Sequence, residues 1–187
     1  VWGYGTEVSA LMWNGGVVEA RLMPGERTGD PAQLDVWPAT PLLAFASTVT
    51  TVEAGTPEDL VLKKDPASGR ILLSGRLPLG GGWSGRLAVP DPALHATTAL
   101  ASALQARGIR LLGEVVTSRD PLPPALRVLA VHEGETLAEI VREVNKESHN
   151  AHAEALLRLV GRRAKGLGSV DGGRAAVLEV LQRLGVP

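Results

Sequence analysis

The stretch Val144-Asn145-Lys146-Glu147-Ser148-His149-Asn150-Ala151-His152-Ala153-Glu154-Ala155-Leu156-Leu157 lies between two runs of helical periodicity. Upstream, apolar residues recur with the i, i+3, i+4, i+7 spacing of an amphipathic helix, at Leu137, Ile140, Val141 and Val144. Thr136 and Glu139 have capping-box spacing at the start of that helix. Downstream, the apolar pattern resumes at Ala153, Leu156, Leu157 and Val160 and is predicted to end at Gly161. Ser148-His149-Asn150 should therefore lie where one helix ends and the next begins.

The serine and the asparagine at this junction have two interpretations. Both residue types are favoured helix N-caps, because a side-chain oxygen can accept hydrogen bonds from amides that the first helical turn leaves unpaired. A Ser-x-Asn triplet is also short enough to occur by chance, so the spacing alone favours capping over catalysis. A catalytic interpretation therefore depends on the residues around the triplet.

Those residues resemble the second active-site motif of the class C penicillin-binding proteins, the D-alanyl-D-alanine carboxypeptidase/endopeptidase family. In that family an Asn-Lys-x-Ser-x-Asn segment precedes a helix that reads roughly Ala-Glu-x-Leu-Leu. The matching positions are Asn145, Lys146, Ser148, Asn150, Ala153, Glu154, Leu156 and Leu157. Two other places resemble the family: Val8-Ser9-Ala10-Leu11 looks like the start of its large insertion, and Val89-Pro90-Asp91-Pro92 looks like the exit.

The resemblance implies a serine acyl-transferase that acts on peptidoglycan stem peptides and is trapped by β-lactams. Ser148 would relay a proton to the departing D-Ala nitrogen, and Asn150 would orient the substrate through its amide. These two residues form the expected catalytic set. Lys146 is left out of it, since a lysine at a helix C-terminus also suits the helix dipole.

Two further motifs of that family are missing from this sequence. No serine has a lysine three residues on, and no lysine is followed by Thr-Gly or Ser-Gly. We therefore expect an inactive piece of a periplasmic or cell-envelope enzyme whose nucleophile lies elsewhere. The alternatives are a non-catalytic envelope module that binds glycan or peptide, and an unrelated domain with a chance triplet. Serine-x-x-lysine upstream and Lys-Thr/Ser-Gly downstream in the reading frame would favour the enzyme.

The histidines raise the question of a metal. His149 stands where the family commonly has aspartate, and we expect its side chain to face solvent at the helix junction. His149, His152 and Glu154 are close in sequence, but no His-Glu-x-x-His pattern is present. The sequence therefore predicts no metal and no cofactor, which calorimetry with zinc can check.

Composition excludes several other functions. The net charge of -1 comes from 19 basic and 20 acidic residues that are interspersed, so no basic footprint for nucleic acid is present. Cysteine is absent, which removes disulfides and thiol catalysis. No apolar run reaches the roughly 18 residues that a membrane span needs.

The chain starts at Val1 and stops at Pro187, directly after a predicted helix. We therefore expect a fragment whose helices expose apolar faces, and such faces invite homodimerisation.

The first 119 residues read as β-rich. Asn14-Gly15-Gly16 predicts a tight hairpin between strands at Val8–Trp13 and Val17–Met23. Further strands are predicted at 34–37, 48–52, 60–64, 71–74 and 86–89, and the last three would form a small antiparallel subdomain with Gly80-Gly81-Gly82 in a hairpin loop. Asp91-Pro92 should start a helix over 92–107, and a strand over 109–116 should complete a strand-helix-strand unit.

These elements predict an α+β fold: a β-rich insertion region, followed by an all-helical part of a serine β-lactamase/transpeptidase-like domain. The insertion region should span residues 1–119 and could contain two nested subdomains. The first would combine residues 1–52 with 108–119, and the second, residues 53–107, would be inserted into it. Prolines mark a linker over 120–126. Residues 127–187 should form the helical part, with a short strand at 127–132 and three helices. The last helix should carry Val177, Val180, Leu181 and Leu184 on one face and stop at Gly185.

Overall fold

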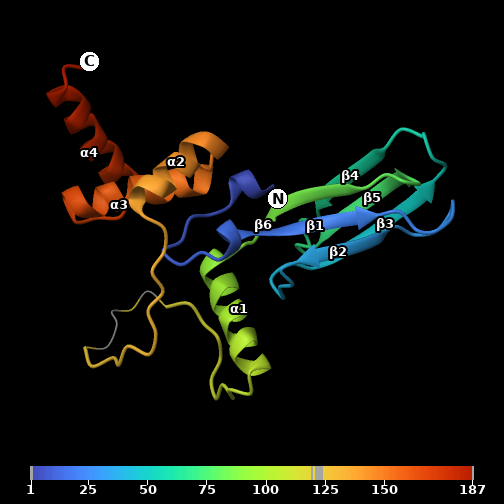
Figure 1. The fold of residues 1–187 in the computed structure, drawn as a ribbon, viewed down its shortest axis with the longest axis horizontal. Helices are drawn as coiled ribbons and strands as arrows, with labels where there is room; N and C mark the ends of the chain where they lie inside the picture. The colour runs from blue at the N-terminus through green and yellow to red at the C-terminus, as the bar shows by residue number, and fades with distance from the viewer. Residues whose placement is uncertain (1, 119, 121–123, 187) are drawn as a thin grey trace. The chain divides into compact units, whose positions relative to one another are not determined.

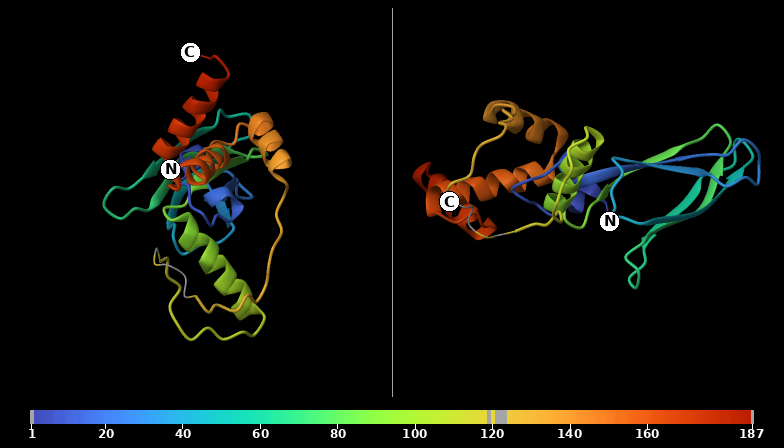
Figure 2. Two further views of the ribbon diagram at one scale, coloured as in Figure 1. Left: turned by 90° about the vertical axis from the view of Figure 1, so that its left-hand side faces the viewer. Right: turned by 90° about the horizontal axis from the view of Figure 1, so that it is seen from below.

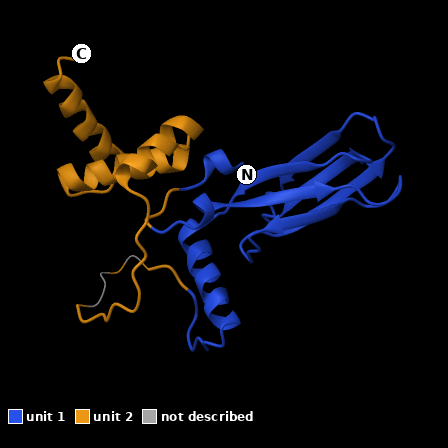
Figure 3. Cartoon of the chain, in the orientation of Figure 1, with its two compact units in different colours: residues 1–7, 11–115 blue, residues 8–10, 116–187 orange. Residues whose placement is uncertain are grey.

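The computed structural model describes residues 2–118, 120 and 124–186, and it divides the chain into two compact units (Figure 3). Unit 1 is Val1–Glu7 with Leu11–Val115, and unit 2 is Val8–Ala10 with Val116–Pro187. Two small sheets and four α-helices are present among the described residues, so the predicted α+β class is confirmed. Residues 121–123 of the predicted linker lie outside the described residues.

The first sheet of unit 1 is antiparallel and has the order β2-β1-β6 (Figure 1). Its strands are β1 (Val17–Met23), β2 (Gln33–Trp37) and β6 (Trp83–Ala88). Along β1, Val18, Ala20 and Leu22 are buried, which is the alternation expected of a strand with one face in a core. The strands predicted over 34–37 and 86–89 are thereby confirmed with small shifts in their ends.

The second sheet is mixed and has the order β3-β5-β4. Its strands are β3 (Phe45–Val52), β4 (Asp59–Lys64) and β5 (Ile71–Pro78). β4 and β5 form an antiparallel hairpin, while β3 lies parallel to β5. The antiparallel pairing of β4 with β5 is as predicted, but β6, the third strand of the predicted subdomain, pairs with β1 in the first sheet. Gly80-Gly81-Gly82 therefore connects one sheet to the other rather than closing a hairpin.

The two sheets share one hydrophobic core, and Figure 2 shows them as two layers. Both sheets contribute fully buried aliphatic side chains to it. The buried core residues are Val18, Ala20, Leu22, Ala32, Leu43, Val49, Ile71, Leu73, Leu77, Leu87 and Val89. Each small sheet would be marginal alone, and the shared core allows both to bury one face.

The hairpin predicted at Asn14-Gly15-Gly16 is wrong. Val8–Trp13 is not a strand, and Asn14–Gly16 is a single 3-10 turn. β1 has β2 on one edge and β6 on the other, so neither edge can accept a strand from residues 8–13. Val8–Ala10 instead belongs to unit 2, where it lines a pocket together with residues of helix α3 (Asn150–Lys165).

Helix α1 (Pro92–Ala106) follows β6, as predicted. The Asp91 carboxylate caps its first turn by accepting a hydrogen bond from the Leu94 amide at 2.9 Å. His95 on this helix is buried, with Nδ1 3.2 Å from the Thr40 hydroxyl and its ring beside Trp13. Burial lowers the pKa of His95, because removal from water disfavours the charged imidazolium.

The strands predicted over 109–116 and 127–132 are wrong, since neither stretch is assigned as a strand where the structure describes it. Both carry the aliphatic residues that favour strands, but they pair with no other strand among the described residues. Their apolar side chains are correspondingly exposed, including Leu112, Val116, Val128, Leu129 and Val131. The strand-helix-strand unit is therefore only a strand and a helix.

The helices of unit 2 are α2 (Leu137–Glu147), α3 (Asn150–Lys165) and α4 (Val170–Arg183). The capping box at the start of α2 is present as predicted. At the end of α4, Leu184 is the C-cap and Gly185 follows with a φ of 74°, so the predicted stop is confirmed. Every helix among the described residues is too short or too polar to span a lipid bilayer.

Gly161 does not end α3, as the sequence suggested, because the helix continues to a left-handed Gly166. Gly161 is buried where α3 crosses α4, and a Cβ there would lie 2.6 Å from the Gly173 nitrogen. Gly161 therefore allows α3 and α4 to cross closely, and it does not end the helix. An ion pair between Lys165 and Glu179 also joins the two helices, and it lowers the pKa of the Glu179 carboxyl.

The capping box of α2 gives a pH-dependent contribution to stability. Thr136 donates to the Glu139 carboxylate from its hydroxyl at 2.7 Å and from its amide at 2.8 Å, and these bonds hold the Glu139 pKa below its ordinary 4.5. Because the folded state has the lower pKa, this stabilisation is complete above the unfolded pKa and is lost as pH falls through the folded pKa.

We therefore expect Glu139→Gln to destabilise the chain at neutral pH, with a deficit that shrinks under acid conditions. Urea unfolding followed by circular dichroism, at about pH 7 and about pH 3, measures this difference. Glu135→Gln is the control, since Glu135 is exposed and makes no hydrogen bond within the described part of the chain. A deficit of equal size at both pH values would contradict the assignment.

Candidate active site

The junction between α2 and α3 places the Ser148-His149-Asn150 triplet as the sequence predicts. Ser148 follows the last residue of α2, His149 is the N-cap of α3, and Asn150 is the first residue of α3. The amide of His149 donates to the Val144 carbonyl at 3.2 Å, spanning five residues. This bond is the 6→1 hydrogen bond of a Schellman motif, which satisfies a carbonyl that the helix end would leave unpaired.

Ser148 occupies the left-handed position of that motif, with φ 56° and ψ 48°. Glycine usually stands there, since a side chain in this conformation costs about 1–2 kcal/mol. Among the described residues, Asn14 is the only other non-glycine residue with positive φ. Ser148 therefore stands in a backbone conformation that costs free energy at this helix junction.

We expect Ser148→Gly to stabilise the 187-residue chain by about 1 kcal/mol, because glycine adopts the left-handed conformation without steric cost. Urea or thermal unfolding followed by circular dichroism measures the change. Ser148→Ala is the matched control, since it also removes the hydroxyl but keeps a Cβ at the strained position. Equal stability of the two variants would show that the backbone conformation carries no strain.

Both proposed catalytic side chains are accessible. Ser148 and Asn150 are exposed, and neither side chain makes a hydrogen bond to any described residue. Neither residue is the N-cap of α3, because His149 has that position and makes no side-chain capping bond. The capping interpretation of the triplet is therefore wrong in this structure, and the hydroxyl and the amide are free to contact another molecule.

Lys146 lies in the last turn of α2 and is exposed. A positive charge at this end of a helix is favourable, because the helix dipole places partial negative charge there. The position of Lys146 is thus accounted for by the helix dipole, and its part in catalysis is not tested by the structure.

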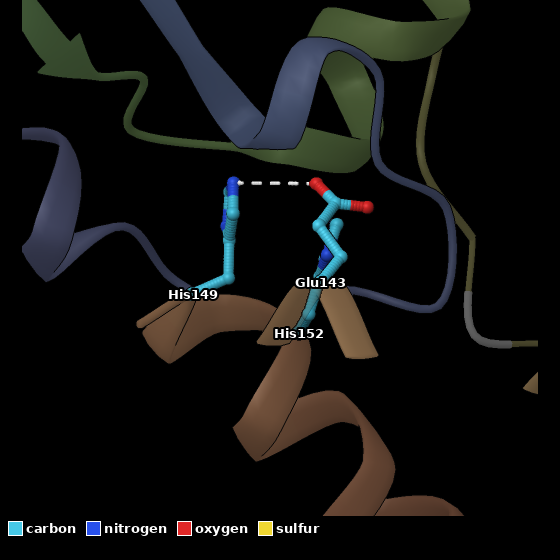
Figure 4. A group of neighbouring side chains, drawn as sticks. All are labelled: Glu143, His149 and His152. Carbon is cyan, nitrogen blue, oxygen red and sulfur yellow. Dashed lines mark ion pairs between the residues drawn. The ribbon is translucent and has the colours of Figure 1, made fainter. Parts of the chain in front are cut away.

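His149 does not face solvent, contrary to expectation. Its side chain is 22% exposed, and its ring stacks on that of His152 with centroids 4.5 Å apart and planes 15° from parallel. His149 Nε2 lies 3.9 Å from a carboxylate oxygen of Glu143 on α2 (Figure 4). Glu143, His149 and His152 thus offer three donor atoms that all lie within 4.8 Å of one another.

Glu154, which is close to these histidines in sequence, does not belong to their cluster and is paired with Arg158 instead. Its carboxylate accepts hydrogen bonds from Arg158 one turn further along α3, at 2.6 and 3.1 Å. Glu143 takes its place in the cluster. The chain changes direction at the left-handed Ser148, so Glu143 and His149 are not related by helical spacing and no pattern in the sequence predicts their contact.

Comparison with known proteins covers almost the whole chain. Residues 2–187 match the family model described as the D-Ala-D-Ala carboxypeptidase 3 (S13) family. A curated D-alanyl-D-alanine carboxypeptidase of Actinomadura sp. (strain R39) is 30% identical over 193 residues, covering 99% of this chain and 36% of that protein. The chain thus spans about a third of this relative's length.

Two solved structures of penicillin-binding protein 4 from Haemophilus influenzae have a similar fold. One, a complex with a β-lactam, has a TM-score of 0.73 and 22% identity, covering 97% of this chain and 43% of that one. The other has a TM-score of 0.76 and 20% identity, covering 99% of this chain and 41% of that one. At these identities the likeness concerns the fold alone.

Proposed function

The chain belongs to the D-Ala-D-Ala carboxypeptidase 3 (S13) family, and from this premise we propose that it forms part of a serine-type carboxypeptidase or endopeptidase. Its substrates in this proposal are peptidoglycan stem peptides that end in D-Ala-D-Ala, and β-lactams act as trapping analogues. The parent protein would work in the periplasm or elsewhere in the cell envelope. The nucleophilic serine and its lysine would lie outside these 187 residues, which contain no Ser-x-x-Lys.

In the proposed reaction the nucleophilic serine adds to the carbonyl of the scissile D-Ala bond and gives its proton to the lysine. The C–N bond then breaks, and the departing nitrogen needs a proton. Ser148 would pass that proton from the lysine to the nitrogen through its hydroxyl, which can accept and donate at once. Asn150 would donate from its amide to the acyl-side carbonyl of the substrate.

One observation supports this assignment above the others: Ser148 stands in a left-handed conformation that favours glycine, with its hydroxyl exposed and without a partner in the described residues. A serine with a structural role would form a hydrogen bond between its hydroxyl and the backbone at the helix end. Here a backbone amide, that of His149, pairs with the Val144 carbonyl, so the Ser148 hydroxyl is available to a substrate.

We also propose a division of roles along the chain. Residues 127–187, which include α2, α3 and α4, would be the helical part of the catalytic domain, and residues 1–119 would belong to its insertion region. The proline-rich segment over 120–126 would connect them. In this arrangement unit 1 carries no reacting group, and Ser148 and Asn150 are the contribution of the chain to catalysis.

The test is intact-mass analysis of the complete open reading frame that encodes this chain, after incubation with a penicillin. The 187-residue chain is the control. We expect a mass increase equal to the penicillin on the long form and none on the 187-residue chain, because a β-lactam acylates the nucleophile and the adduct persists. No adduct on a folded long form would overturn the proposal and favour a non-catalytic envelope-binding module.

A further inference from the structure

We propose that Glu143, His149 and His152 form a binding site for a divalent transition-metal ion of the zinc class at the α2–α3 junction. Two imidazoles and one carboxylate are a donor set that zinc accepts, and three protein ligands leave a fourth position open for water. The inference concerns metal binding alone and does not depend on the proposed peptidase chemistry.

The unsatisfied polar atoms of the cluster support this site. Nδ1 of the half-buried His152 is shielded from solvent and has no hydrogen-bond partner among the described residues. Buried polar atoms are nearly always paired, so an orphaned ring nitrogen calls for an explanation. The separation of 3.9 Å between His149 Nε2 and the Glu143 carboxylate is likewise too long for a hydrogen bond. A cation between these groups would engage the lone pairs that the protein leaves unused.

The geometry requires only side-chain movement. The donor atoms lie within 4.8 Å of one another, whereas ligands about 2.0 Å from a tetrahedral zinc ion are about 3.3 Å apart. His149 Nε2 already faces the Glu143 carboxylate (Figure 4), so rotations of the two stacked rings about their Cα–Cβ and Cβ–Cγ bonds would only have to shorten the separations between the donor atoms. The backbone of α2 and α3 already brings the three residues to the same place.

Such an ion would connect the two helices across Ser148. Glu143 lies on α2, His149 is the N-cap of α3 and His152 lies in its first turn, so the ligands flank the left-handed serine on both sides. Bound metal would therefore resist any change in the angle at the junction. We expect zinc to raise the unfolding temperature, because an ion that binds only the folded state shifts the equilibrium toward it.

The test is titration of the 187-residue chain with zinc chloride by calorimetry, repeated with cobalt chloride by visible absorption. We expect one site per chain and the intense absorption bands of four-coordinate cobalt. Glu143→Gln and His152→Ala should each weaken binding by more than about a hundredfold, which exceeds the loss expected from an outer-shell partner.

Glu154→Gln is the matched control. It removes a carboxylate from the same neighbourhood, but one already bonded to Arg158, so binding should be unchanged. Circular dichroism establishes that each variant is folded before titration, and Glu143→Gln decides the question if His152→Ala unfolds. Absence of zinc binding to the folded wild-type chain, or unchanged affinity of the folded Glu143→Gln variant, would overturn the proposal.

Discussion

Replacing Ser148 by alanine in the complete protein should lower the rate of acylation by a penicillin by about 10²–10⁴-fold, the range that positioned proton transfer contributes. In the proposed mechanism the leaving nitrogen can no longer receive a proton through the serine hydroxyl. Binding of the β-lactam should change much less, because the alanine variant keeps the left-handed backbone and the accessible surface around it. Stopped-flow or quenched mass spectrometry at several β-lactam concentrations separates the acylation rate constant from the dissociation constant.

Ser148→Gly provides the control that distinguishes chemistry from folding. Alanine keeps the strained conformation and glycine relieves it, yet both variants lack the hydroxyl. An equal loss of acylation in the two variants would therefore assign the effect to the missing oxygen. Acylation of the alanine variant at the wild-type rate would remove Ser148 from the proton path and leave Asn150 as the only expected catalytic residue of the chain.

Gly173→Ala should destabilise the helices of unit 2 by about 3 kcal/mol, the upper end of the usual cost of overpacking. A Cβ at Gly173 would meet the Leu157 carbonyl oxygen and would lie 2.7 Å from Leu157 Cγ. The carbonyl belongs to the backbone of α3, so no rotation of a side chain relieves the contact. The two helices must move apart, and the contacts along the whole crossing weaken.

Gly134→Ala is the control for that experiment, because a Cβ there meets nothing within 4 Å and the backbone has an ordinary φ. It should leave the stability unchanged or raise it slightly, since alanine restricts the unfolded chain. Urea unfolding followed by helical circular dichroism compares the two variants on one scale. A Gly173→Ala variant as stable as the wild type would mean that α3 and α4 do not cross as closely as the structure has them.

Local signals in the sequence predicted the helices well. The capping box at Thr136 and Glu139, the Asp91-Pro92 start and the Gly185 stop each act within a few residues, so the sequence near them is sufficient. Gly161 shows where this reasoning fails. A glycine that ends a helix and a glycine that admits a neighbouring helix look alike in sequence, and only the position of Gly173 distinguishes them.

Strands were predicted less well, since a strand exists only when another strand pairs with it. Residues 109–116 have the composition of a strand and no partner among the described residues, while Val8–Trp13 adjoins a strand whose edges are both occupied. The same limit applies to the candidate site. The triplet was located from its flanking helices, but the left-handed Ser148 and the approach of Glu143 depend on how the chain turns there.

The placement of Val8–Ala10 within unit 2 has a consequence for the order of folding. A ribosome makes these three residues before β1, yet they line a pocket with Ala155, Arg158 and Leu159 of α3, which emerge much later. Unit 1 contains both sheets and can form while α3 is still being made, because domains generally fold as units during synthesis. The helical unit must then pack against Val8–Ala10, although the residues on both sides of that segment belong to unit 1. Completion of the helical unit should therefore be the late, non-local step in folding.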